Sequence, residues 1–224
     1  MEFEDVIRGR RSIRGYKTDP VPKELIKQVV ALADRAPSSM NTQPWHFHVV
    51  TGEPLDKIRK GNTERTMAGV APSREIRMHG AYKGVHRDRQ KEIAGQLFEA
   101  MGIDWGDKER RQDWVLRGFR QFDAPVSIVV TYDEDLAEND IAIFDCGAAV
   151  NGLVNAAWSM GLGAVINGQG IMQSPVVRQH AEIPEGQVIL TCVAMGYPVP
   201  DFPANEVVSR RRAVDDVTSF VGFD

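Results

Sequence analysis

Residues 141–161 form an almost uninterrupted apolar stretch, long enough for a helix of about five turns. The stretch contains Asp145, Asn151 and Asn155, and Asp140 borders it. Those polar groups would be costly in the hydrocarbon of a bilayer. The sequence therefore predicts a long buried helix rather than a membrane span. At 224 residues the chain is long enough to bury about 70% of its unfolded surface, so a core of this kind is feasible.

Shorter segments on both sides of this stretch predict helices and strands that alternate loosely. Helices are expected at 3–10, from 23 to before Pro37, and at 54–59, and strands at 45–51, 126–132, 164–166 and 187–195. So few strands favour a layered α+β architecture in one domain, 1–224. Within it, residues 61–122 are expected to form a helical excursion over the active site, and residues 205–224 an extended C-terminal tail.

Composition and charge exclude several classes of protein. Apolar residues make up 42% of the chain and charged residues 26%, which is a globular mixture. The formal net charge of −4 provides no basic field for nucleic acid or an anionic membrane. Cys146 and Cys192 both lie in apolar runs, which favours buried reduced thiols and a cytoplasmic protein. The acidic N-terminus carries no secretory signal pattern.

Several common catalytic signatures are missing from the sequence. It has no G-x-G-x-x-G or G-x-x-x-x-G-K-[ST] motif, so a Rossmann or P-loop nucleotide site is not expected. It has no G-x-S-x-G motif for a serine hydrolase. Its histidines show no metal-ligand spacing, and no metal site is predicted. They are His46, His48, His79, His86 and His180.

Two arginine-rich segments lie at opposite ends of the chain. In an extended segment, Arg10, Ser12 and Arg14 point to the same side, and two guanidinium groups beside a hydroxyl can hold a phosphate. The alternative is a solvated basic turn that follows a helix. The run at 210–212 is a solvated surface feature unless folding brings it to the first segment.

Two loops have a composition suited to a flat ligand. Residues 37–45 are dense in short hydrogen-bonding side chains between prolines, and residues 166–170 combine glycines and amides after a strand. Either loop could lie against a planar heterocycle, and either could be an ordinary turn. Arg117 or Arg120 could supply positive charge beside a reduced cofactor, or lie on a solvated helix face.

Taken in order, these segments resemble the FMN-dependent nitroreductase family, in particular the branch that acts on nitroaromatic drugs and herbicides. The resemblance covers nearly the whole chain. Its strongest signals are R-R-S-I-R at 10–14 and A-P-S-S-M-N-T-Q-P-W-H-F at 36–47. Weaker ones are D-A-P at 123–125, G-L-G at 161–163, M-G-Y-P at 195–198 and the arginine-rich tail.

The resemblance implies a central, mostly antiparallel sheet flanked by helices, in an obligate homodimer with FMN at the subunit interface. The tail, 205–224, would wrap the partner. The FMN phosphate and ribityl chain would be held by Arg10, Arg11, Ser12, Arg14, Arg210 and Arg211. The other subunit would line the flavin ring with Pro37, Ser38, Ser39, Asn41 and Gln43. Asn167 and Gly168 would approach flavin N5 through their backbone.

The activity that this resemblance implies is hydride transfer from NADPH or NADH to flavin N5, and then to a nitroaromatic or quinone substrate, by ping-pong exchange. No protein nucleophile takes part, and Arg117 or Arg120 would stabilise negative charge at flavin N1. Tyr82, Phe98, Trp105 and Trp114 are candidates for the substrate groove or for the core. Two alternatives remain: a flavoenzyme of the same fold with another task, such as ene reduction or dehalogenation, and a non-redox phosphate-binding module.

Overall fold

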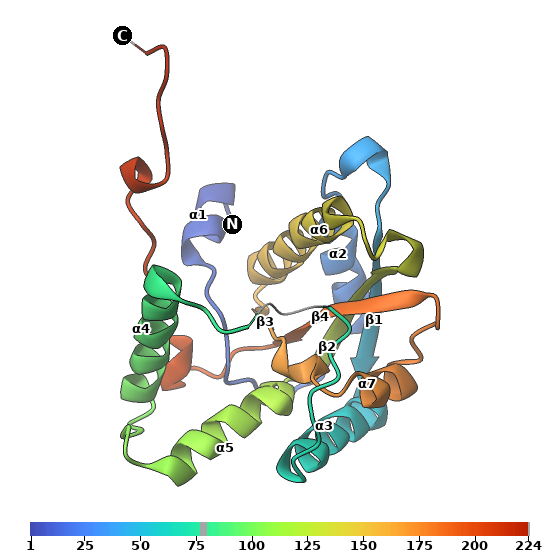
Figure 1. The fold of residues 1–224 in the computed structure, drawn as a ribbon, viewed down its shortest axis with the longest axis vertical. Coiled ribbons are helices and arrows are strands. Elements are labelled where there is room, and N and C mark those ends of the chain that lie inside the picture. The colour runs from blue at the N-terminus through green and yellow to red at the C-terminus, as the bar shows by residue number, and fades with distance from the viewer. Residues whose placement is uncertain (77–79, 224) are drawn as a thin grey trace.

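The structure is a computed structural model that describes residues 1–76 and 80–223. Its centre is a four-stranded antiparallel sheet in the order β1-β2-β4-β3 (Figure 1). The strands are β1 (Trp45–Thr51), β2 (Val126–Asp133), β3 (Gly163–Ile166) and β4 (Gln187–Gly196). Helices cover both faces, so the predicted α+β fold with an antiparallel sheet is confirmed.

Strand β2 has side chains buried on both faces of the sheet, which explains its continuous apolar sequence. Ile128 and Val130 point into a cluster formed with α2 (Lys23–Ala33) and α6 (Asp140–Ser159). Val129 points the other way, into a cluster with α3 (Gly52–Met67) and α7 (Ser174–Ala181). The alternation follows from the two-residue period of a strand.

Helix α6 corresponds to the long apolar stretch. Asn139 caps it, because its side-chain oxygen accepts a hydrogen bond from the Ile141 N–H at 3.0 Å. Cys146, Ala149 and Leu153 are fully buried within the fold. Among the described residues, α6 alone is long and apolar enough to cross a bilayer, but half of its most apolar window is buried inside the protein. Its packing against α2 and the sheet agrees with a core helix.

On the face of the sheet opposite α6, the helices differ from the sequence prediction in two respects. Helix α3 runs from Gly52 to Met67, well beyond the expected 54–59. Its second half is polar, so hydrophobic periodicity could not reveal it. Helix α7 (Ser174–Ala181) was not predicted at all, because it is short. Leu55, Ile58 and Val177 form the contact between these two helices and the sheet.

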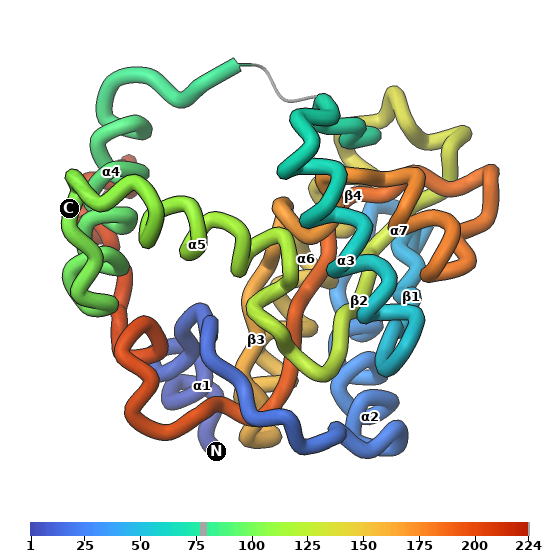
Figure 2. The backbone as a smooth tube through the Cα atoms, turned by 90° about the horizontal axis from the view of Figure 1, so that it is seen from below, coloured from blue at the N-terminus to red at the C-terminus, as the bar shows by residue number. Residues whose placement is uncertain are grey.

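Residues 61–122 contain the end of α3 and two further helices, α4 (Gly84–Ala100) and α5 (Lys108–Phe119). Both stand beside the sheet, and α4 is the more distant of the two (Figure 2). His79 lies outside the described residues. The role of this excursion as a cover for the active site stays a prediction.

The two chain ends lie on the same side of the molecule. Helix α1 (Phe3–Gly9) packs against α6. After β4 the chain passes through a short 3-10 turn, Pro203–Asn205, and the tail then points away from the body (Figure 1). Phe220 and Phe223 near its end are largely exposed and contact each other.

Candidate functional site

Asn205 joins the N-terminal arginine segment to the base of the tail. Its side-chain oxygen accepts hydrogen bonds from the N–H groups of Arg14 (2.7 Å) and Gly15 (3.0 Å). Its side-chain nitrogen donates to the Gly15 carbonyl at 2.9 Å. The contact is close: a Cβ at Gly15 would lie 2.3 Å from the Phe202 ring. The two ends of the chain therefore meet at a buried amide.

Arginines from both ends line one cavity of about 510 Å³ beside this junction. Arg10, Ser12 and Arg14 face it from the N-terminal segment, and Arg211 faces it from the tail. We call it the phosphate cavity. None of the described residues that line it is acidic. A doubly charged phosphate would balance these cations.

The electrostatics of the phosphate cavity also favour an anion. Burial lowers the pKa of Arg14 below its ordinary value. Burial also lowers the pKa of Arg10, and the nearby charge of Arg211 adds to that shift. In both cases the charged guanidinium is less stable than in water. An anion bound between Arg10 and Arg211 would remove this penalty.

Two of the predicted phosphate ligands have other partners. Arg11 forms an ion pair with Glu206 at 2.9 Å, and its guanidinium lies 5.6 Å from the Trp158 ring centroid. Arg210 lies 3.4 Å from Glu92 on α4. Arg11 still lines the cavity, whereas Arg210 does not. Their contact with a phosphate stays a prediction.

A second cavity, of about 480 Å³, adjoins the phosphate cavity at Arg14. Arg14, Phe122 and Trp114 form part of its wall, and residues 165–169, at the end of β3 and in the loop that follows it, form another part. We call it the ring cavity. Its volume, the aromatic side chains in its wall and its glycine-containing loop suit a planar ring system. A nucleotide with its phosphate at Arg14 could extend its ring into this space.

The loop after β3 is held rigidly by Asn167, which is buried. The Asn167 side chain donates to the Gly118 carbonyl at 2.7 Å and accepts from the Gln169 N–H at 3.0 Å. Its backbone N–H donates to the Cys192 carbonyl at 2.7 Å. These bonds commit Asn167 to the protein, and they leave Gly168 at the cavity wall. A backbone approach to flavin N5 therefore falls to Gly168, and it stays a prediction.

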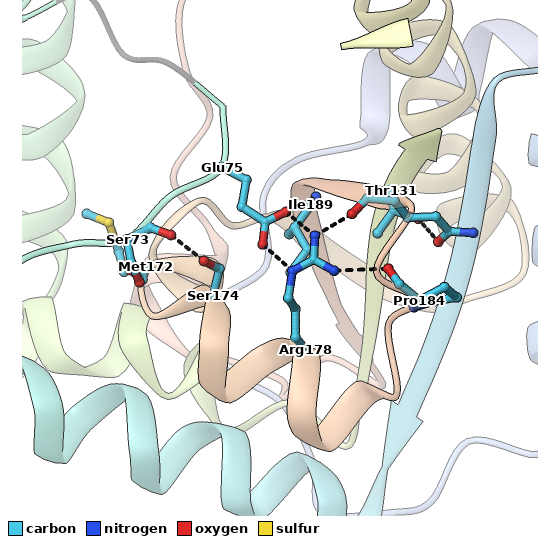
Figure 3. Close-up of polar contacts among 9 residues, drawn as sticks. Ser73, Glu75, Thr131, Met172, Ser174, Arg178, Pro184 and Ile189 are labelled. Atoms are coloured by element: carbon cyan, nitrogen blue, oxygen red, sulfur yellow. Dashed lines mark hydrogen bonds and ion pairs between the residues drawn. The ribbon is translucent and has the colours of Figure 1, made fainter. Parts of the chain in front are cut away.

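Arg74 also lines the ring cavity, although no sequence pattern indicated it. Its guanidinium donates to the Gly168 carbonyl at 3.3 Å. The residues on either side of Arg74 are fastened to the body (Figure 3). Glu75 forms a two-pronged ion pair with Arg178 of α7, at 2.6 and 2.7 Å, and accepts from the Ile189 N–H at 2.6 Å. The Ser73 N–H donates to the Met172 carbonyl at 2.8 Å.

The two arginines predicted to stabilise flavin N1 line neither the phosphate cavity nor the ring cavity. Arg117 donates to the Arg14 carbonyl at 3.1 Å, and its guanidinium lies 5.4 Å from the Phe202 ring centroid. Arg120 lies 3.4 Å from the Asp123 carboxylate. The geometry therefore favours Arg74 and Arg14 over both as the positive groups beside a ring.

The loop at 37–43 lies apart from both cavities within a single chain. Figure 1 shows it beyond the ends of α2 and α6, on the other side from α1. The buried Asp145 carboxylate accepts from the Ser39 N–H at 2.9 Å, and the Ser38 hydroxyl accepts from the Gln43 N–H at 3.0 Å. Asn41 and Gln43 have positive φ values of 60° and 47°. Strained non-glycine residues of this kind are often kept for function.

The two cysteines and the paired histidines have structural surroundings. Burial raises the pKa of the Cys146 and Cys192 thiols to about 12. Both are free and would be protonated near neutral pH. His46 lies 2.9 Å from Asp133, and His48 lies 2.8 Å from Gln187. Over residues 1–76 and 80–223, no group of three or more potential metal ligands is found.

An α+β fold with cationic and ring-sized cavities at the junction of the chain ends defines a candidate nucleotide-cofactor protein. The model of the Nitroreductase family matches residues 7–197. The chain is 33% identical to nitrobenzene nitroreductase of Ectopseudomonas oleovorans, over 98% of this chain and 96% of that protein. It is 28% identical to 4-nitrobenzoate reductase of Nocardioides sp., over 99% and 91%. The protein belongs to the nitroreductase family.

The fold agrees with solved structures of this family. The FMN-dependent nitroreductase NfnB from Mycobacterium smegmatis, solved in complex with NADPH, superposes with a TM-score of 0.89. It shares 25% sequence identity with this chain, and the alignment covers 97% of each. The family resemblance inferred from the sequence is thus confirmed.

Proposed function

We propose that the protein is an FMN-dependent oxidoreductase that uses NADPH or NADH to reduce nitroaromatic compounds. The observation that carries this proposal is the gathering of Arg10, Arg14 and Arg211 on one cavity that continues, past Arg14, into a ring-sized cavity. The relatives named for nitrobenzene and 4-nitrobenzoate reduction, and the FMN- and NADPH-dependent neighbours, support it.

The residues fit FMN on physical grounds. The phosphate cavity offers cations whose charge is penalised by burial and by each other, and it offers no acidic residue in its described lining. The Ser12 hydroxyl at the same cavity can donate to a phosphate oxygen. Arg11, which also lines the cavity, would add positive charge near the same phosphate. Gly168 and Arg74 line the ring cavity and would lie along the edge of a ring bound there.

Bound FMN would supply the redox chemistry, accepting hydride from the nicotinamide and passing it to the nitro compound. The residues of this chain would position the cofactor and set the electric field around its ring. Arg74, held by its fastened neighbours, keeps a positive charge at the ring edge, where charge builds up on reduction. Gly168 offers a backbone without a side chain, so that the ring edge can lie close to it. Phe122 and Trp114 keep that part of the cavity apolar.

The same proposal includes a homodimer. Pro37, Ser38, Ser39, Asn41 and Gln43 would line the ring from the second copy, because within one chain they lie apart from the ring cavity. The exposed apolar side chains of Phe3, Phe144 and Phe220 are suited to burial against that copy, with the tail wrapped over it. The free, buried thiols suit a cytoplasmic protein.

The test follows the colour of the purified protein under anaerobic conditions. The protein, reconstituted with FMN, is expected to be yellow, to bleach with NADPH or NADH, and to regain its colour with nitrobenzene. Yellow protein that bleaches but does not respond to nitroarenes would favour an ene reductase or dehalogenase. Protein that retains no FMN after reconstitution would favour a non-redox phosphate-binding module.

A further inference from the structure

A third cavity, of about 900 Å³, lies between α3, α4 and α5. We call it the helical cavity. Each of the two excursion helices presents a single face to it, with residues spaced three or four apart. The lining residues on α4 are Arg87, Gln90, Lys91, Ala94 and Phe98, and those on α5 are Lys108, Arg111, Gln112, Val115, Leu116 and Phe119.

The interior of the helical cavity is apolar and partly aromatic. Phe98 and Trp105 meet edge to face, with ring centroids 4.8 Å apart. Leu116 and Phe119 of α5 extend the same surface. Edge-to-face aromatic walls of this kind bind flat apolar rings. The cavity is therefore suited to an aromatic ligand.

The charged residues of the helical cavity are all basic. Arg87, Lys91, Lys108 and Arg111 line it, and none of its described lining residues is acidic. Within the described part of the chain, none of these four side chains forms an ion pair. Arg87, Lys91 and Lys108 are exposed at the rim and Arg111 is partly buried, so four cations surround an apolar space in a chain whose net charge is −4. Charge complementarity therefore points to an anionic ligand.

Two buried polar atoms in the same lining have no hydrogen-bond partner among the described residues. They are Nε of Arg111, a donor, and Oγ1 of Thr66, which can donate or accept. A buried polar atom without a partner costs free energy, and such atoms usually mark a missing ligand or water. A carboxylate beside Arg111 would accept from Nε and offset the positive charge.

The helical cavity adjoins the ring cavity. Gln90, Ala94, Phe98 and Val115 line both of them. A flat molecule at this shared wall would have one end toward Gly168 and Arg74, and its other end toward Arg111 and Lys91. The reacting group and the anionic group would then lie at opposite ends of the molecule.

We propose that the helical cavity binds the anionic end of a carboxylated nitroarene and so gives the enzyme a preference for negatively charged substrates. The inference rests on the proposed reduction of nitroarenes, because it names the class of substrate for that reaction. Arg111 and Lys91 act as specificity-determining residues that hold the carboxylate while the nitro group lies over the ring.

The first experiment compares 4-nitrobenzoate with its neutral methyl ester in anaerobic steady-state assays of the FMN-loaded protein. The Lys91→Gln, Arg111→Gln double variant is expected to lose about tenfold or more in kcat/KM for the carboxylate, chiefly through KM. The ester is expected to change less than about twofold, because it carries no charge. Arg111→Lys, which retains the charge, is expected to keep most of the preference.

A matched control lies on the same helix. Arg89 of α4 is exposed and outside the cavity, so Arg89→Gln removes one charge without changing the lining. It is expected to leave the ratio of the two kcat/KM values unchanged. If Arg89→Gln lowers that ratio as much as the Lys91→Gln, Arg111→Gln double variant does, the effect is one of overall charge, and the proposal is wrong.

The second experiment measures binding without turnover. Calorimetry on the FMN-loaded protein compares 2-naphthoate with 2-naphthamide, and the double variant is expected to weaken only the naphthoate, by about tenfold. Unchanged binding and an unchanged carboxylate-to-ester ratio would overturn the proposal. A rise confined to the KM of NADPH would also overturn it, because the hydride donor's phosphates would then be the occupant. If no nitroarene is turned over while naphthoate binding depends on Arg111, the proposed function fails and the anion site stands.

Discussion

The N-terminal and C-terminal arginine segments face the same cavity but are held very differently. Around Arg10–Arg14 the chain is fixed: the Ile13 N–H donates to the Ala164 carbonyl at 3.1 Å, and the Ile13 side chain is buried. Beyond Glu206, Arg211 bonds only to Ser209 and Arg210 among the described residues, and all of these are exposed. One half of the proposed phosphate site is thus preformed. The other half must be ordered by a ligand or by a second copy of the chain.

The largest effect is expected at the junction of the two segments. Asn205→Ala would leave the N–H groups of Arg14 and Gly15 and the Val199 carbonyl without the side chain that pairs them, while the Gly15 carbonyl would still accept from the Val199 N–H. Each unpaired buried group costs about 1–3 kcal/mol, so the free energy of unfolding should fall by about 3 kcal/mol or more. Denaturant titration measures this loss. A fall of less than about 1 kcal/mol would show that the junction does not hold the two ends together.

The next largest effect is expected on FMN affinity, where one arginine from each segment can be compared. Arg14→Ala should weaken FMN binding by about a hundredfold, because its half-buried guanidinium needs no ordering. Arg211→Ala should weaken it by about tenfold, because part of its contact energy is spent on ordering the tail. Titration of the apoprotein, followed by flavin fluorescence, gives both constants. Equal losses would mean that the tail is as well ordered as the N-terminal segment.

The buried helices and strands of this fold could be predicted from the sequence, but the candidate site could be predicted only in part. The reason is that local sequence reports burial and does not report which distant segments meet. Strand β2 and helix α6 bury most of their apolar side chains, so their continuous apolar sequences alone locate them. The arginine clusters could also be found, but nothing in their spacing says that they meet. Their meeting depends on Asn205, an isolated amide in a proline-rich segment. Arg74 was missed for a similar reason, because its place depends on Glu75 and Arg178, which are 103 residues apart.

A smaller effect, on stability, is expected at the ion pair that joins the segment before α4 to α7. Glu75→Gln keeps the shape of the side chain but removes the charge that binds Arg178. Because both side chains are partly exposed, the loss of stability should be about 1 kcal/mol. Hydrogen exchange should rise at residues 70–76 and stay unchanged at residues 10–16. Faster exchange in both regions would mean that residues 10–16 and residues 70–76 open together, and that the N-terminal segment is not held independently.

The smallest effect is expected at Arg210, the tail arginine that faces away from the phosphate cavity. Its ion pair with Glu92 is exposed and should contribute less than about 1 kcal/mol. Arg210→Gln should therefore leave FMN affinity within about twofold of the original value. A loss as large as that of Arg211→Ala would show that Arg210 turns toward the phosphate when FMN binds.

The central claim is that the two ends of the chain meet on one FMN phosphate. A crystal structure of the protein with FMN tests it most directly. The phosphate should lie within hydrogen-bond distance of Arg10 or Arg14 and of Arg211, with the ring edge at Gly168 and the loop 37–43 of a second copy against the ring. A phosphate bound elsewhere, with Arg211 still in solvent, would contradict the claim.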